Sequence, residues 1–275
     1  MKATPILFSA PMVQAIIAGR KTQTRRIIKP QPTPTPEDYT GPTGHWWPSK
    51  SHRSMIHIED EMQKLVGLAC DCSPYGRPGD PIYVRETYFQ RGHWEPVNGK
   101  NTKGGKQKWE FSPESHEIQF VEPAEYRKAR DVKDPFTVVW HKRLGRFMPR
   151  RYSRITLEIT DIRVQRVQEI VSLDAIAEGI SEYATAGTTR EHGMAWGEVP
   201  NGTPDDAVYW LADYSADLPE DADRAITLDP RESFKGLWQA VNGAESWTSN
   251  PWVWAVTFKP HTVNVDQFIK EGAAS

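Results

Sequence analysis

The chain has 275 residues, with 34 Lys and Arg against 36 Asp and Glu and a formal net charge of −2. Hydrophobic residues make up 38% and the mean hydropathy is −0.63 without a long apolar run, which excludes a disordered chain and a membrane span. The balanced total charge predicts no general affinity for nucleic acid. Tryptophan is in excess, at 11 residues, so we expect some indole rings to face a ligand, a groove or a partner.

The first predicted element is a helix that ends at Gly19. Ser9 can cap it, Pro11 suits its first turn, and the apolar residues of 12–17 follow helical spacing. A segment with five basic residues and no acid follows at 19–29, and then a proline-rich loop. Such unevenness allows a neutral chain to carry a basic face.

The sequence pattern in the middle of the chain predicts strands. Residues 79–89 resemble a turn that leads into a strand, and 91–129 suggest an insertion or an extended hairpin. Apolar residues then alternate from Ile155 to Ile159 and slip out of phase near Asp161, which indicates a β-bulge or a strand break.

The last third alternates helices and strands. A short helix at 172–180 has Ser172 as its predicted N-cap, and 181–228 is an acidic, irregular insertion. Phe234 to Val241 show helical spacing that ends at Gly243, and alternation from Trp252 to Phe258 predicts a strand. We expect the tail beyond Pro260 to be loosely attached.

This order leaves too little chain between strands for βαβ crossovers, and therefore favours an α+β fold with a small barrel over a parallel sheet. Cys70 and Cys72 are too close for a favourable disulfide and too few for zinc, so we expect reduced thiols, no metal and no cofactor. The first twelve residues are too short and too polar for a secretory signal, and we expect a cytoplasmic protein with no membrane contact.

The basic segment is the first candidate site. It contains Arg20, Lys21, Thr24, Arg25 and Arg26. Crowding by arginines pushes Lys21 toward its neutral, basic form, and a hydroxyl nearby is a potential nucleophile. Phosphate binding and a solvated surface are the alternatives. Because an ideal strand puts Lys21 and Thr24 on opposite faces, they can cooperate only if the chain bends between them.

Two glutamates are further candidates. Glu178 lies at the end of the short predicted helix, where the helix dipole disfavours a carboxylate, so a salt bridge to the basic segment or a role as an acid or orienting group must justify it. Glu86, beside Arg85 in the first predicted strand, forms an ordinary cross-strand charge pair or lines a pocket mouth.

A second basic stretch, 141–154, has six basic residues and no acid. Arg150 and Arg154 flank Tyr152, an arrangement that suits a nucleic-acid backbone with one stacked base, or a strand edge that resists aggregation.

The segment from Gly19 to Arg26 resembles the signature of the ASCH family, whose pattern is Gly-x-Lys-x-x-Glu-x-Arg. Gly19, Lys21 and Arg26 match, and Thr24 stands where many members have Glu. Five further segments agree in order, as in the larger ASCH proteins of bacteriophages and prophages. They begin at Pro78, Met148, Leu173, Phe234 and Asn250.

The resemblance implies a single PUA-like β-barrel domain over 1–260, flanked by short helices, with a tail at 261–275. It leaves insertions at about 31–70, 90–140 and 181–230, the last two of them long. One branch of the family, the N4-acetylcytidine amidohydrolases, carries the Lys and Thr together with a later Glu. In that branch Thr is the proposed nucleophile, Lys its activator and Glu the proton donor or orienting group, which by motif are Thr24, Lys21 and Glu178.

The resulting prediction is an amidohydrolase that removes an N4-acyl group from a modified cytidine, in which Arg26 or a backbone N–H stabilises the oxyanion. Arg20, Arg25, Glu86, Arg150 and Arg154 are expected to contact the nucleoside or nucleic acid. The alternatives are a non-catalytic module that recognises a modified base in RNA or DNA, a metal-independent ribonuclease, and a phage interaction protein that docks a partner through the acidic segment 202–230.

Overall fold

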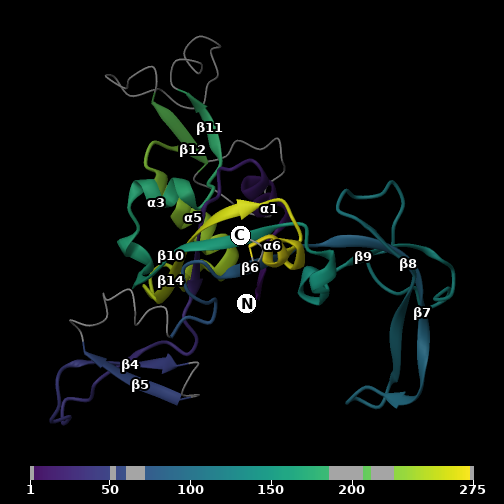
Figure 1. The fold of residues 1–275 in the computed structure, drawn as a ribbon, viewed down its shortest axis with the longest axis horizontal. Helices are drawn as coiled ribbons and strands as arrows, with labels where there is room; N and C mark the ends of the chain where they lie inside the picture. The colour runs from purple at the N-terminus through teal and green to yellow at the C-terminus, as the bar shows by residue number, and fades with distance from the viewer. Residues whose placement is uncertain (1–2, 50–53, 60–71, 186–206, 212–225, 273–275) are drawn as a thin grey trace.

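A central sheet of five strands forms the body of the protein (Figure 1). The computed structural model describes residues 3–49, 54–59, 72–185, 207–211 and 226–272. The order of the sheet is β1 (Thr4–Leu7), β6 (Pro81–Arg85), β10 (Thr156–Arg166), β14 (Trp252–His261) and β2 (Gln23–Ile27). Neighbours are antiparallel except for the parallel pair β1–β6. The α+β prediction is confirmed.

The long pair β10–β14 forms the centre of the hydrophobic core. Its register shifts between Ile159 and Asp161, which confirms the bulge expected there. The extra residue reverses the alternation, so that Ile159 and Ile162 are both buried although they are three residues apart.

Four α-helices are seen in the described part of the chain: α1 (Ala10–Ile17), α3 (Ser172–Ala177), α5 (Pro230–Asn242) and α6 (Val265–Gly272). Short 3₁₀ turns supplement them at Gly145–Phe147, Arg150–Tyr152, Val167–Glu169 and Ala244–Ser246. The first three helices match the predicted ones, although α3 has Val171 rather than Ser172 at its N-cap position. None of the helices in these residues has the length and apolar content to cross a membrane.

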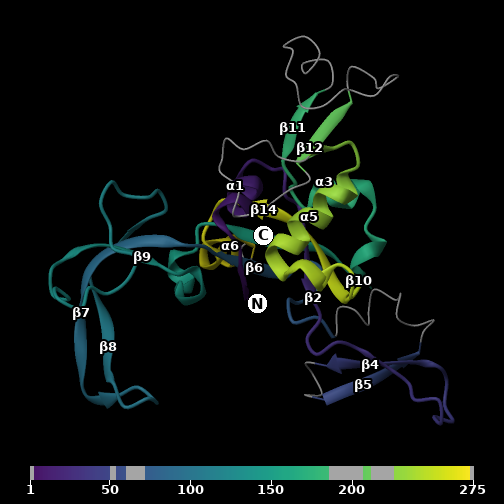
Figure 2. The same cartoon turned by 180° about the vertical axis from the view of Figure 1, so that it is seen from behind.

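The three predicted insertions contribute three small sheets that surround the central one (Figures 1 and 2). The first sheet comprises β3 (Thr33–Pro34), β4 (Gly44–Ser49) and β5 (Ser54–Glu59); the second β7 (Tyr88–Asn101), β8 (Gln107–Gln119) and β9 (Val139–Arg143); the third β11 (Glu182–Thr185), β12 (Val208–Leu211) and β13 (Ile226–Thr227). The extended hairpin expected after Arg91 is β7–β8. Cys70 and most of the acidic segment 202–230 lie outside the described residues.

The first insertion also completes the central core. Trp47 of β4 is 2% exposed, belongs to the same buried cluster as β10 and β14, and meets Trp252 edge-on with 5.3 Å between ring centroids. At least one tryptophan of an insertion therefore serves the core rather than facing a ligand, a groove or a partner.

The closed barrel expected from the sequence is not found among the described residues. β1 and β2 are the edges of the central sheet, and no backbone ladder joins them in the observed strand order. Arg26 of β2 instead donates a hydrogen bond from Nη2 to the Leu7 carbonyl oxygen of β1 at 2.7 Å. A side chain thus links the two edges where strand pairing does not.

The tail also differs from our expectation. Its helix α6 buries Val265 completely, and Asp266 forms an ion pair with Arg150 at 2.6 Å. Asn264, just before the helix, donates hydrogen bonds to the carbonyl oxygens of Arg150, Arg151 and Ser153. The charged composition of the tail suggested a loose end, but one amide side chain fastens it to the 3₁₀ turn at 150–152.

We therefore expect Asn264→Ala to lower the free energy of unfolding by about 1–2 kcal/mol, because three backbone acceptors lose a shared donor. Chemical denaturation measures the change. Gln267→Ala, which removes an exposed hydrogen bond to Glu271, is the control and should change stability by less than about 0.5 kcal/mol. Equal losses in both variants would contradict the proposed role of Asn264.

Candidate functional site

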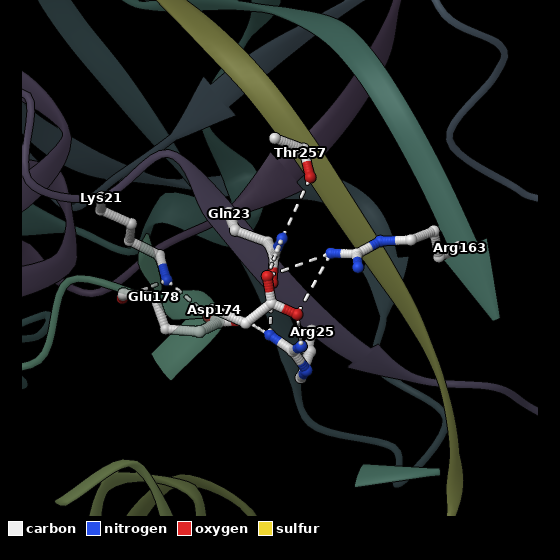
Figure 3. Close-up of polar contacts among 7 residues, drawn as sticks. All are labelled: Lys21, Gln23, Arg25, Arg163, Asp174, Glu178 and Thr257. Carbon is white, nitrogen blue, oxygen red and sulfur yellow. Dashed lines mark hydrogen bonds and ion pairs between the residues drawn. The ribbon is translucent and has the colours of Figure 1, made fainter. Parts of the chain in front are cut away.

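Lys21 is the most deeply buried charged residue of the candidate site, at 1% exposure. After α1 the chain turns at Gly19, and Lys21 pairs with Glu178 in an isolated bridge before β2 begins at Gln23. The Nζ donates to the Glu178 carboxylate at 2.9 Å and to the Glu178 carbonyl oxygen at 2.7 Å (Figure 3). Burial lowers the pKa of Lys21 below its ordinary value, although Glu178 partly opposes this.

Glu178 owes its position to the way α3 ends. It is the C-cap residue of α3, and Gly179 follows with a φ of +77°. A Cβ at Gly179 would lie 2.7 Å from the Cβ of Lys21, so only glycine permits the two segments to come this close. The salt bridge that we expected from Glu178 to the basic segment is confirmed.

A network of charges continues from Glu178 along β2. Arg25 donates from Nη1 to Glu178 at 3.0 Å and from Nη2 to Asp174 at 2.8 Å (Figure 3). Arg163 reaches the same Asp174 carboxylate at 3.2 Å. Lys21, Arg25 and Arg163 are thus joined in one network through Glu178 and Asp174, and Arg163 also contacts Asp161 at 3.2 Å.

Gln23 connects this network to the central sheet. Its side-chain amide donates to Asp174 at 3.3 Å and to the Thr257 hydroxyl at 3.1 Å. Among the described residues, no group of three His, Cys, Asp or Glu side chains is arranged to hold a metal ion.

Lys21, Thr24, Arg25, Arg26 and Glu178 line one pocket of about 60 Å³. Lys21 lies before the regular strand β2 and Thr24 lies within it, and both line the pocket, so the opposite faces of an ideal strand do not separate them. The opposite wall is largely apolar and comes from α1 and α5. It is formed by Met12, Phe234, Leu237, Trp238, Val241 and Asn242. The pocket is therefore lined by a hydroxyl and charged groups in one part and by apolar side chains in the other.

The indole of Trp238 belongs to this wall. The side chain is 4% exposed, and its Nε1 has no hydrogen-bond partner within the described structure. A buried N–H without a partner is uncommon. It leaves the apolar wall with one donor that a ligand could satisfy.

The other predicted site residues lie outside this pocket. Arg20 is exposed and is not part of the lining. Glu86, between β6 and β7, forms a two-pronged ion pair with Arg154, with both hydrogen bonds at 2.9 Å. Arg150 pairs with Asp266. Glu86 thus forms a charge pair with a residue from another segment, Arg154, as one of its two predicted roles required.

Four features of the site were not predicted from the sequence: Gln23, Asp174, Arg163 and the α5 wall. Asp174 lies four residues before Glu178, so helical spacing alone places the two carboxylates on one face. Gln23 and Arg25 share a face of β2 by strand alternation. The α5 wall was predicted only as core, because the same apolar face packs inward and borders the pocket.

Asp174 should give the protein part of its resistance to acid. Burial by itself raises the pKa of Asp174, but the charges and hydrogen bonds of Arg25 and Arg163 outweigh burial and hold this pKa below its ordinary value of 3.8. A carboxylate with a lowered pKa contributes stability that is complete above pH 3.8 and is lost as the pH falls through the folded-state pKa. We expect Asp174→Asn to cost about 1–3 kcal/mol at pH 7 and progressively less below pH 3.8.

Urea unfolding at a series of pH values measures this effect. Asp161→Asn is the matched control, because Asp161 contacts the same Arg163 at 3.2 Å but is 39% exposed. Its cost should stay below about 1 kcal/mol. A penalty for Asp174→Asn that does not change with pH would contradict a stabilising role for the charge of the carboxylate.

Comparison with known proteins identifies no relative for this chain. No family model matches it, and neither a curated protein nor a solved structure is significantly similar. The likeness to the ASCH family thus rests on the sequence segments alone, and the chemistry of the site must be inferred from its geometry.

Proposed function

We propose that this protein is an amidohydrolase of the ASCH, PUA-like type that acts on nucleosides or nucleic acid and removes an N4-acyl group from a modified cytidine. The observation that carries the proposal is the shared pocket of Lys21, Thr24 and Glu178, in which a hydroxyl and a buried lysine–carboxylate pair line the same small cavity. A nucleophile, a base and a proton donor are the three groups that amide hydrolysis requires.

The lysine–glutamate pair supplies the base. Burial disfavours the charged form of Lys21, and the 2.9 Å hydrogen bond allows its proton to pass to the Glu178 carboxylate. Neutral Lys21 then accepts the proton of the Thr24 hydroxyl as the Thr24 oxygen forms a bond to the acyl carbon. Lys21 and Glu178 therefore share one proton before the attack and two after it, and Glu178 later gives one of them to the leaving group.

The charge on the pocket suits the intermediate. Negative charge develops on the acyl oxygen, and Arg25 and Arg26 line the cavity beside Lys21. The bond between the acyl carbon and N4 then breaks, Glu178 gives its proton to N4, and the cytidine leaves. Water hydrolyses the threonine ester, which releases the acid and restores the hydroxyl.

The size of the cavity limits what enters it. At about 60 Å³ it is far smaller than an ordinary ligand pocket of roughly 300 Å³ or more. We therefore expect a small acyl group to enter while the base lies against the wall of α5, where the Trp238 Nε1 has no partner. Acetyl should be removed faster than benzoyl.

The decisive measurement is release of cytidine and acetate from N4-acetylcytidine by the purified protein. Thr24→Val preserves side-chain shape without the hydroxyl, and Lys21→Met removes the amine; each should lower kcat/KM by about 1,000-fold or more. Thr22→Val is the control, since Thr22 is not part of the pocket lining, and it should retain activity.

Near-ultraviolet circular dichroism checks that the variants fold. Full activity in folded Thr24→Val would eliminate the nucleophile assignment. Binding of acetylated nucleoside without turnover would favour the non-catalytic alternative, and cleavage of RNA in place of deacylation would favour the ribonuclease.

A further inference from the structure

The β7–β8 hairpin ends in a cluster of lysines that the pocket does not use. Four lysines occur within nine residues, at 100, 103, 106 and 108, and no acid lies between Glu95 and Glu110. All four are exposed, and none forms an ion pair with another described residue. Figures 1 and 2 show the hairpin extending from the body on the side opposite α3 and α5.

Hydrogen bonds give this tip a defined shape. The Thr102 amide donates to the Lys106 carbonyl oxygen at 2.7 Å, and the Gly105 amide donates to Thr102 at 2.9 Å. The Gln107 side chain ties Val97 to Lys108 by donating to both carbonyl oxygens. The backbone that carries the lysines is therefore a closed turn with a defined shape. Lysines are more frequent in this turn than in the rest of the hairpin.

Two aromatic residues lie beyond the lysines, at the base of the hairpin tip. Trp109 follows the last lysine directly and lies 6.1 Å from the ring of Phe136, which is 60% exposed. The guanidinium of Arg130 lies 4.2 Å from the centre of the Trp109 ring. Arg130 thus holds one face of the indole, while Phe136 presents most of its surface to solvent.

We propose that the hairpin tip and the Trp109–Phe136 pair bind single-stranded nucleic acid. Unpaired ammonium groups attract successive phosphates, and an exposed aromatic ring stacks on an unpaired base. A duplex offers its phosphates to the lysines, but its bases are stacked on one another and cannot stack on the aromatic rings. An acidic peptide without aromatic residues, such as polyglutamate, likewise supplies charge but no planar ring to stack.

This inference deepens the proposed function, on which it rests for its link to acylated cytidine, because it makes a polymer rather than a free nucleoside the substrate. The binding itself needs nothing from the pocket. The hairpin holds the strand at a site remote from Lys21 and raises the local concentration of its bases near the protein. Free N4-acetylcytidine should therefore be hydrolysed equally well without the tip lysines.

The test measures binding of a fluorescent single-stranded oligouridine of roughly 20 nucleotides by anisotropy across a range of salt concentrations. The triple variant Lys100→Ala, Lys103→Ala, Lys106→Ala should weaken binding and reduce the slope of log K against log salt by about 2, since each phosphate contact contributes about 0.7. The control replaces Lys235, Lys259 and Lys270, which lie outside the hairpin, and removes the same charge. It should leave the slope unchanged.

Phe136→Ala separates stacking from charge. It should weaken binding roughly tenfold without altering the salt slope, because stacking releases no counterions. Equal affinity for a duplex of the same length, or for polyglutamate, would overturn the single-strand assignment. Equal losses of affinity in both triple variants would show that only the net charge of the protein matters, and would also overturn the assignment of binding to the hairpin tip.

Two further outcomes distinguish this inference from the proposed function. Oligonucleotide binding that depends on the tip, without deacylation of N4-acetylcytidine, contradicts the chemistry of the pocket and supports the hairpin. Deacylation that depends on Thr24, without oligonucleotide binding, supports the pocket and contradicts the hairpin.

Discussion

The ion pair between Lys21 and Glu178 organises the site, since it joins residues 157 positions apart at the junction of β2 and α3. Burying two charges is costly unless each is paired and hydrogen-bonded, so the surrounding groups must be placed to satisfy them. Arg25 takes the second oxygen of Glu178, and the backbone carbonyl of Glu178 takes a further hydrogen bond from Lys21. Gly179 provides the close approach that this geometry needs. The pair thus fixes where the helix meets the sheet and, with that, where the pocket lies.

The same charges set the electrostatics of the pocket. Burial lowers the pKa of Lys21 below its ordinary value, and the charge and hydrogen bond of Glu178 partly oppose this shift. Arg25 is in turn anchored by Asp174, which Arg163 of β10 also contacts. The positions of these charged groups therefore depend on three segments that are distant in the sequence.

The pocket lining comes from β2, α1, α3 and α5 and includes no residue of the three small sheets, which extend from the body (Figures 1 and 2). The tryptophans do not divide in the same way. Trp47 of the first insertion is buried like Trp238 and Trp254 of the body, whereas Trp109 of the β7–β8 hairpin is partly exposed. Glu86, Arg150 and Arg154, which the sequence suggested as contacts to substrate, lie outside the pocket and form ion pairs with one another or with α6.

Local patterns determined much of the fold. Apolar periodicity and the positions of glycines predicted α1, α3, α5, the strands β10 and β14 and the bulge in β10, because these depend on near neighbours in the chain. The basic segment and the awkward position of Glu178 also indicated a salt bridge. Only the tertiary structure decided that Asp174 and Arg163 belong to the network, that the sheet stays open between β1 and β2, and that Asn264 fastens the tail. Each of these depends on contacts between residues far apart in the sequence, which no periodicity records.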